Sequence, residues 1–174
     1  MPAGQHHDQI VQSVACAVIT VSDTRTPDTD KSGSLIRRRL VDAGHSVVSY
    51  DILPDDPQRV RNRVLALCCE PQCDAILLTG GTGLSAHDTT FEAVDAILEK
   101  RLDGFGELFR ALSYEQIGPA AMLSRAVAGT RNGKAIFVMP GSEAAVSLAM
   151  EKLILPELGH IVWLVGNRRS GVVA

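Results

Sequence analysis

The chain has 174 residues, of which 45% are hydrophobic and 21% are charged, and its formal net charge at pH 7 is −3. This length and composition predict one globular domain with a buried core. The slight acidity argues against a nucleic-acid surface, and every apolar run is shorter than the roughly 20 residues that a membrane-spanning helix needs. Because the chain also opens without a basic and then apolar leader, we expect a cytoplasmic protein.

The two ends and the cysteines carry no predicted function. Residues 1–12 and 166–174 lack an apolar period, so we expect two tails on either side of a single domain at residues 13–165. The cysteines lack the paired spacing and nearby histidines of a zinc site. We interpret them as free, buried thiols: Cys16, Cys68, Cys69 and Cys73.

The first part of the chain predicts two successive strand and helix units. Residues 14–21 form an apolar run that suits a buried strand, and residues 32–44 follow with a helical period. A second strand is expected at residues 46–53. A second helix is expected at residues 55–69.

The same alternation continues to the end of the predicted domain. A third strand is expected at residues 74–79 and a helix at 89–102, then a fourth strand at 134–139 and a long helix at 142–161. Strands that alternate with helices predict an α/β fold. We expect three layers, α/β/α, with a mostly parallel central sheet.

Helix end signals support these boundaries. Gly44 is placed to end the first helix. Asp56 suits the N-cap of the second helix, and Pro57 suits its first position. Thr89 and Glu92 have the spacing of a capping box at the start of the third helix.

Acids and glycines follow the expected strands. In a parallel sheet the carboxyl ends of the strands meet at one edge, where ligands bind. The acids are Asp23, Asp30, Asp55 and Asp88, and the glycines are Gly33, Gly81, Gly83 and Gly141. Carboxylates beside an anion-binding turn would repel a phosphate unless a divalent cation lay between them, so we expect Mg²⁺ at this edge. Four solvated loop acids are the alternative interpretation.

The segment "TGGTGLSAHD" gives the sharpest signal, because it places a nearly side-chain-free turn between a strand and a helix. Such a turn lets a ligand approach the backbone, and its N–H groups favour an anion. No Lys-Ser or Lys-Thr follows, which excludes a P-loop. "GTGLSA" fits the loose dinucleotide pattern, but the acid expected about 20 residues later falls near Asp103, outside any expected strand.

Five segments resemble, in order, the motifs of molybdenum-cofactor biosynthesis proteins of the MoaB/MogA type. They are "TVSDTR…DKSG", "LPDD", "LLTGGTGLSAHD", "MLSRAVAG" and "MPGSEAAVSLAMEKLILPELGHI", and with its flanking residues the resemblance extends from about Val14 to Ile161. "GFGELFRALSYEQIG" is similar to the B branch of that family. The resemblance implies a MogA-like fold. It also implies a molybdopterin adenylyltransferase, which uses Mg²⁺ and ATP to convert molybdopterin into adenylyl-molybdopterin with release of pyrophosphate.

The resemblance also implies roles for particular residues. Asp55 and Asp88 match catalytic positions, and Asp88 is also the implied Mg²⁺ ligand. The implied ligand-binding residues are Ser22, Asp23, Ser32, Gly33, Thr79, Gly80, Gly81, Thr82, Gly83, Ser124, Arg125, Pro140, Gly141 and Ser142. The planar guanidinium of Arg125 suits a phosphate, with a structural role as the alternative. Many relatives carry Arg and Pro where this chain has His87 and Phe91.

Assembly and two other functions complete the expectations. The resemblance implies a homotrimer or homohexamer that contacts the enzyme of molybdenum insertion. One alternative function is a carrier that binds molybdopterin without transferring an adenylyl group. The other is a dinucleotide-binding enzyme. Pyrophosphate release that requires both ATP and molybdopterin separates the transferase from the carrier.

Overall fold

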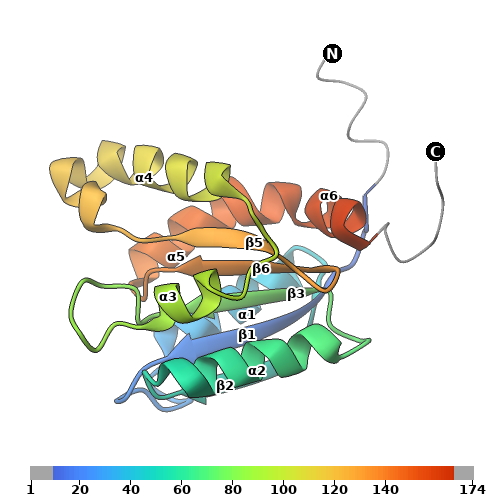
Figure 1. Cartoon of the computed structure of the whole chain (residues 1–174). Coiled ribbons are helices and arrows are strands. Elements are labelled where there is room, and N and C mark those ends of the chain that lie inside the picture. Colours follow the sequence, from blue (N-terminus) through green and yellow to red (C-terminus); the bar gives the residue numbers. More distant parts are fainter. Residues whose placement is uncertain (1–9, 167–174) are drawn as a thin grey trace.

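The computed structural model describes residues 10–166 and shows a six-stranded sheet between two layers of helices (Figure 1). The strands are β1 (Ala15–Val21), β2 (Ser46–Leu53), β3 (Ala75–Thr79), β4 (Lys100–Arg101), β5 (Val127–Arg131) and β6 (Lys134–Met139). Their order in the sheet is β2-β1-β3-β6-β5-β4. The first four in this order are parallel, whereas β5 and β4 are antiparallel to their neighbours. The predicted α/β/α fold with a mostly parallel sheet is therefore confirmed.

Helices cover both faces of the sheet. They are α1 (Lys31–Asp42), α2 (Pro57–Cys69), α3 (Thr90–Asp95), α4 (Asp103–Ile117), α5 (Glu143–Ala149) and α6 (Leu155–Gly166), with a 3-10 helix η1 (Gly118–Leu123) and a π-helical segment η2 (Met150–Ile154). Buried residues of α1, α4, α5, η2 and α6 pack on one face. Those of α2 and α3 pack on the other.

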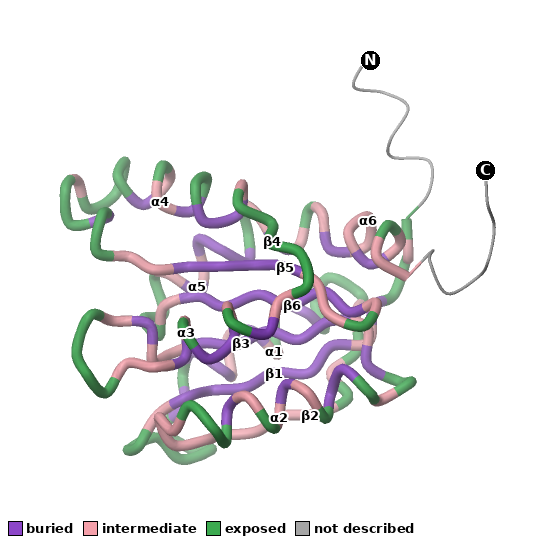
Figure 2. The backbone as a smooth tube through the Cα atoms, viewed as in Figure 1, coloured by how far each residue is buried: buried purple, intermediate pink, exposed green. Residues whose placement is uncertain are grey.

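The core is divided into two halves by the sheet, because successive side chains of a strand point to opposite faces. In β1, Cys16 and Val18 belong to the half under α1, while Ala17 and Ile19 belong to the half under α2. The central strands β3 and β6 are accordingly buried throughout, and β1 is buried at every residue after Ala15 (Figure 2). This explains why they read as continuous apolar runs.

The end signals of the first two helices are confirmed. Gly44 has φ +85°, and its N–H donates to the carbonyl of Val41, as expected for a glycine just past a helix end. The carboxylate of Asp56 accepts from the N–H groups of Gln58 and Arg59 at the start of α2. Gly44 and Asp56 therefore mark the end of α1 and the start of α2.

The predicted helix at residues 89–102 is wrong in its second half. The helix ends at Asp95, and the chain then forms β4 against β5. This pairing is possible because the carbonyl of Lys100 occupies the space that a side chain at Gly129 would fill. Asn132 has φ +46° and the following glycine also has a positive φ, which suits the tight turn between β5 and β6. The predicted helix at 142–161 is interrupted by η2 and continues to Gly166.

Most of the two predicted tails lies outside the described residues. Val11, which falls in the first of them, donates its N–H to the carbonyl of Gly159 over 3.1 Å and packs against the core. In residues 10–166, no helix has the length and apolar character that crossing a membrane requires. The four cysteines are all free, and Cys69 is exposed rather than buried.

Candidate functional site

Three strand ends meet almost without side chains at the carboxyl edge of the sheet. Gly80, directly after β3, has φ +96°, and the carbonyl of Val21 at the end of β1 takes the space of a Cβ there. A Cβ at Gly141, after β6, would lie 3.2 Å from the Cα of Gly80. Glycine at these positions therefore permits the backbones of β1, β3 and β6 to approach one another closely.

Three of the predicted ligand-binding residues hold the turn that follows β6. The hydroxyl of Ser32 donates to the carbonyl of Gly141 over 2.7 Å, and the hydroxyl of Thr79 donates to the carbonyl of Pro140 over 3.0 Å. Ser142 caps α5 by accepting from the N–H of Ala145. These three side chains fix the position of the turn.

Two adjoining cavities open on this edge and share Gly80 and Gly141. One, of about 370 Å³, is lined by Gly80, Gly81, Thr82, Gly83, Asp88, Leu123, Ser124, Arg125, Pro140 and Gly141. The other, of about 130 Å³, is lined by Thr20, Val21, Ser22, Arg25, Asp30, Ser32, Thr79, Gly80 and Gly141. A larger hollow of about 620 Å³ between α1 and β2 contains none of the predicted site residues. The structure thus brings most of the predicted residues together around these two adjoining cavities, although Asp55 lines neither of them.

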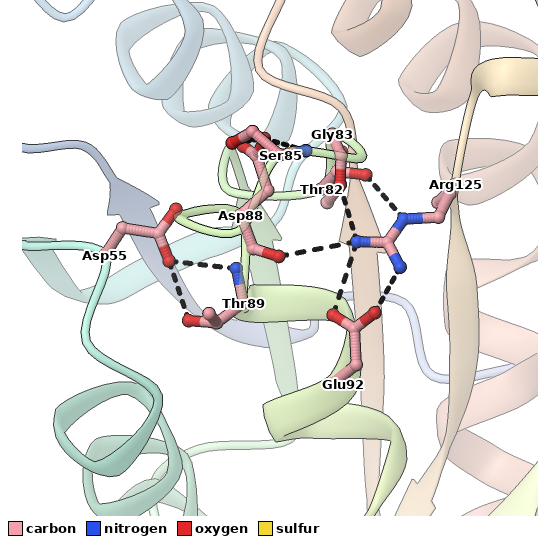
Figure 3. A network of polar contacts seen from close by, with 8 residues as sticks. All are labelled: Asp55, Thr82, Gly83, Ser85, Asp88, Thr89, Glu92 and Arg125. Atoms are coloured by element: carbon pink, nitrogen blue, oxygen red, sulfur yellow. Dashed lines mark hydrogen bonds and ion pairs between the residues drawn. The ribbon is translucent and has the colours of Figure 1, made fainter.

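Asp55 lies two residues after the end of β2 and is tied to the segment that precedes α3 (Figure 3). Its Oδ1 accepts from both the N–H of Thr89, at 3.1 Å, and the hydroxyl of Thr89, at 2.8 Å. The N–H of Asp55 in turn donates to Asp23 over 3.0 Å. A Cβ added to Gly81 would lie 2.7 Å from Asp55 Oδ2 and would also collide with the hydroxyl of Thr90. Asp55 therefore stands directly over the glycine turn.

Asp88 lies beside the same turn, next to Gly83. Its Oδ2 accepts from the hydroxyl of Ser85 at 2.6 Å and from the N–H of Ser85 at 3.1 Å. The hydroxyl bond is the main reason why the pKa of Asp88 lies below its ordinary value, so the carboxylate stays ionised. A Cβ added to Gly83 would lie 2.5 Å from the same oxygen. Asp55 and Asp88 thus flank the turn over Gly81 and Gly83.

Arg125 is surrounded by acceptors of the protein itself. Its Nε donates to the carbonyl of Thr82 over 2.8 Å, and its Nη2 donates to the carbonyl of Gly83 over 2.6 Å (Figure 3). Both Nη atoms also face the carboxylate of Glu92, which forms an ion pair with Nη1. The guanidinium carbon lies 5.0 Å from the ring centre of Phe91.

Asp30, expected among the rim acids, turns inward and is only 2% exposed. It accepts from Thr20 Oγ1 and from the hydroxyl of Tyr50, each over 2.6 Å, and from the N–H of Gly33 over 2.9 Å. Burial, with the hydrogen bond to Asp30 second, raises the pKa of Tyr50 to about 12. Asp30 therefore lines the smaller cavity at this edge, as expected, but as a buried N-cap of α1 rather than as a solvated loop acid. The hydroxyl of Ser22 likewise serves its own loop.

Sequence reasoning missed the side chains that hold the two acids in place. The predicted capping box of Thr89 and Glu92 is wrong, because Thr89 makes no side-chain cap bond to α3. Its hydroxyl bonds Asp55 instead, and Glu92 bonds Arg125. Ser85 lies within the glycine motif itself, so its role beside Asp88 could have been predicted.

The site offers carboxylate oxygens to a metal ion but does not supply a full set of protein ligands. Among residues 10–166, no group of three or more His, Cys, Asp or Glu side chains is arranged to hold a metal ion. The carboxylates of Asp55 and Asp88 are the charged oxygens beside the glycine turn. One or two carboxylates are what Mg²⁺ commonly takes from a protein when phosphates and waters supply its other ligands.

Residues 17–160 match the family model described as a probable molybdopterin binding domain. The chain belongs to this family. The molybdenum cofactor biosynthesis protein B of Bacillus cereus is 52% identical over 164 residues, which cover 94% of this chain and 97% of that protein. A crystal structure of a molybdenum cofactor biosynthesis protein B is also 52% identical, with a TM-score of 0.88, covering 91% of this chain and 99% of that one.

The family's structures extend to more distant members. The tungsten cofactor synthesizing protein MoaB from Pyrococcus furiosus is 36% identical, with a TM-score of 0.79 over 90% of this chain and 99% of that chain. The resemblance and the fold of this molybdopterin-binding domain are therefore confirmed. In a dinucleotide-binding motif the glycine segment opens directly into a helix. Here α3 begins only at Thr90, four residues after the end of "GTGLSA", which argues against the dinucleotide interpretation.

Proposed function

We propose that this chain acts in molybdenum cofactor biosynthesis by transferring the adenylyl group of ATP to molybdopterin, with release of pyrophosphate. Membership of the molybdopterin-binding family supports molybdopterin as the ligand. The observation that carries the transfer step is the pair of carboxylates beside a bare glycine turn, with Asp55 next to Gly81 and Asp88 next to Gly83. Two acids with a backbone anion site beside them suit a reaction in which phosphates must be held and aligned.

The residues fit Mg²⁺ as the implied metal. Asp88 would hold it, because this carboxylate lines the larger cavity and stays ionised. Asp55 offers a second oxygen, since its Oδ2 forms no hydrogen bond with any residue of the described part of the chain. When bound, the ion would neutralise phosphate charge during the transfer.

The chain's own contribution is to bind and align. The glycine turn presents backbone to a ligand in the larger cavity, and Asp55 is held beside it by Thr89. The attacking group is the phosphate of the pterin and the leaving group is pyrophosphate, so no protein nucleophile is needed. Ser124 faces the same cavity and is available as a further contact.

We also propose that the protein assembles as a homotrimer or homohexamer. Large apolar side chains are exposed on α4 and η1: Leu108, Tyr114, Ile117, Met122 and Leu123. Large exposed apolar side chains on two successive elements are the kind of surface that contacts between subunits cover. Light scattering of the purified protein would test the assembly, and a monomer at all concentrations would contradict it. Contact with the molybdenum-insertion enzyme and a cytoplasmic location stay predictions.

The test compares two charge-removing variants of equal size. Asp88→Asn should lower magnesium-dependent pyrophosphate release by ~10²-fold or more while molybdopterin binding stays closer to normal. Asp55→Asn should weaken molybdopterin binding measured by calorimetry without nucleotide. Asp28→Asn, which changes an exposed acid of the loop after β1, is the matched control and should leave both measurements unchanged.

The outcome separates transfer from the carrier alternative. A carrier predicts molybdopterin binding without pyrophosphate release in the unaltered protein. If Asp88→Asn released pyrophosphate at a normal rate with saturating magnesium, the assignment of Asp88 would be wrong. Equal molybdopterin affinities for the unaltered protein and Asp55→Asn would remove the assignment of Asp55.

A further inference from the structure

Arg125 joins both ends of the loop that carries Asp88. The residue lies between η1 and β5, about 40 positions beyond the loop in sequence. Its guanidinium donates to the carbonyls of Thr82 and Gly83 at the loop's start and, over 3.5 Å, to the carbonyl of Asp88 at its end. One planar group thereby closes the loop from Thr82 to Asp88.

The same guanidinium is connected to Asp55 through a single peptide group. The carbonyl of Asp88 and the N–H of Thr89 belong to one peptide bond (Figure 3). Arg125 donates to that carbonyl, and Asp55 accepts from that N–H at 3.1 Å. A positive charge on one side and a negative charge on the other suit the dipole of the peptide group. The position of Asp88 is therefore tied to the position of Asp55.

The charge of Arg125 is already balanced inside the protein. Both of its Nη atoms face Glu92, and this contact is the first cause that lowers the pKa of Glu92 below its ordinary value. The bidentate face that would grip a phosphate is thus occupied by a carboxylate. The Arg125 side chain is 22% exposed, whereas that of Glu92 is 59% exposed.

We propose that Arg125, with Glu92 as its counter-ion, is a positioning residue that closes the Thr82–Asp88 loop and sets the place of Asp88 relative to Asp55. In this role Arg125 does not hold a phosphate of the ligand. Lysine cannot replace it, because a single ammonium group lacks the planar set of donors that reaches two separate stretches of backbone and a carboxylate. The catalytic consequence rests on the proposed transferase function, whereas loop closure does not.

The test uses two conservative variants and two controls. Arg125→Lys keeps the positive charge, and Glu92→Gln keeps the size of the side chain while removing its charge. Arg38→Lys on the exposed side of α1 and Glu107→Gln on the exposed side of α4 are the matched controls. Amide hydrogen exchange of residues 83–89, thermal melting and calorimetry with inorganic pyrophosphate in magnesium-free buffer are measured on the full chain.

The positioning role predicts a specific combination of results. Exchange in residues 83–89 should become about tenfold faster or more in both variants while exchange in β1 and β3 stays unchanged. Pyrophosphate affinity should change less than about threefold in Arg125→Lys, because the charge remains and no phosphate contact is lost. In the transfer assay, kcat should fall in both variants with the KM for ATP nearly unchanged. The controls should behave as the unaltered protein.

A phosphate anchor predicts the opposite pattern. Glu92→Gln would then free the guanidinium and tighten pyrophosphate binding, Arg125→Lys would weaken it, and loop exchange would stay unchanged in both. That result overturns the proposal. Because exchange and pyrophosphate binding need no turnover, they decide the role of Arg125 even if the unaltered protein transfers no adenylyl group. If Arg125→Lys lowers the melting temperature strongly, Glu92→Gln alone decides, since its side chain is exposed.

Discussion

A single methyl group added at Gly81 or at Gly83 should have quite different effects, although the two positions are two residues apart. Gly81 has φ +63°, which costs an alanine roughly 1–2 kcal/mol. Its new Cβ would also push Asp55 away from Thr89, with the loss of hydrogen bonds worth ~1 kcal/mol. We therefore expect Gly81→Ala to lose about 2 kcal/mol or more of unfolding free energy, which lowers Tm by roughly 4–8 °C.

Gly83→Ala meets no such backbone cost, since Gly83 has no positive φ. The new Cβ meets only the carboxylate of Asp88, which can swing toward solvent after losing its bonds to Ser85. The lost hydrogen bonds cost ~0.5–1 kcal/mol. Replacing a glycine by alanine lowers the conformational entropy of the unfolded chain, which stabilises the folded state by ~0.4–1 kcal/mol and offsets that cost. Tm should stay within about 2 °C of its original value.

The two variants then distinguish an effect on catalysis from an effect on stability. Gly83→Ala should lower the kcat of pyrophosphate release about tenfold or more with normal stability, because the displaced group is Asp88. Calorimetric scanning and the transfer assay check both quantities on the same samples. An equal loss of Tm in the two variants, or full transfer by Gly83→Ala, would refute the placement of Asp88 over the turn.

Three further predictions concern single side chains. Asp30→Ala leaves two hydroxyls and one backbone N–H without their acceptor, so denaturant unfolding should show a loss of about 3 kcal/mol, against about 1 kcal/mol for Tyr50→Phe. Ser85→Ala should raise the pKa of Asp88 toward its ordinary value, as measured by carboxyl NMR in magnesium-free buffer. In a Tyr114→Phe background, Tyr50 should ionise at about pH 12 by ultraviolet absorbance, and Asp30→Asn should lower that value. Because an unfolded tyrosine ionises near pH 10, the stability linked to Tyr50 is present below pH 10 and is lost as the pH rises toward 12.

Most of the fold could be predicted because its signals are local. The strands at residues 46–53 and 134–139 have the predicted bounds, and Asp56 and Gly44 mark helix ends that depend only on neighbouring residues. The short strand β4 could not be found in this way. It exists because Gly129 leaves room for the backbone of Lys100, and that contact is invisible to helical periodicity.

In the candidate site, too, local features could be predicted and contacts between distant residues could not. Asp55 and Asp88 could be placed at one edge of the sheet because each follows a parallel strand. Their orientation could not be predicted, since it depends on pairs far apart in sequence, such as Arg125 with Glu92 and Asp55 with Thr89. Thr89 and Glu92 have the spacing of a capping box, which assigns both side chains to their own helix. The sequence therefore contains no signal that they bond Asp55 and Arg125 instead.

The meeting of Val21, Gly80 and Gly141 also has a consequence for how the binding site comes into existence during folding. Each of these residues is about 60 positions from the next in sequence, so the chain must close two long loops before they touch. A fragment that ends before β6 lacks the last of the three and cannot offer the complete binding edge. Any molecule that occupies this edge therefore binds only the fully folded chain, and it stabilises the whole domain by an amount that grows with the logarithm of its concentration.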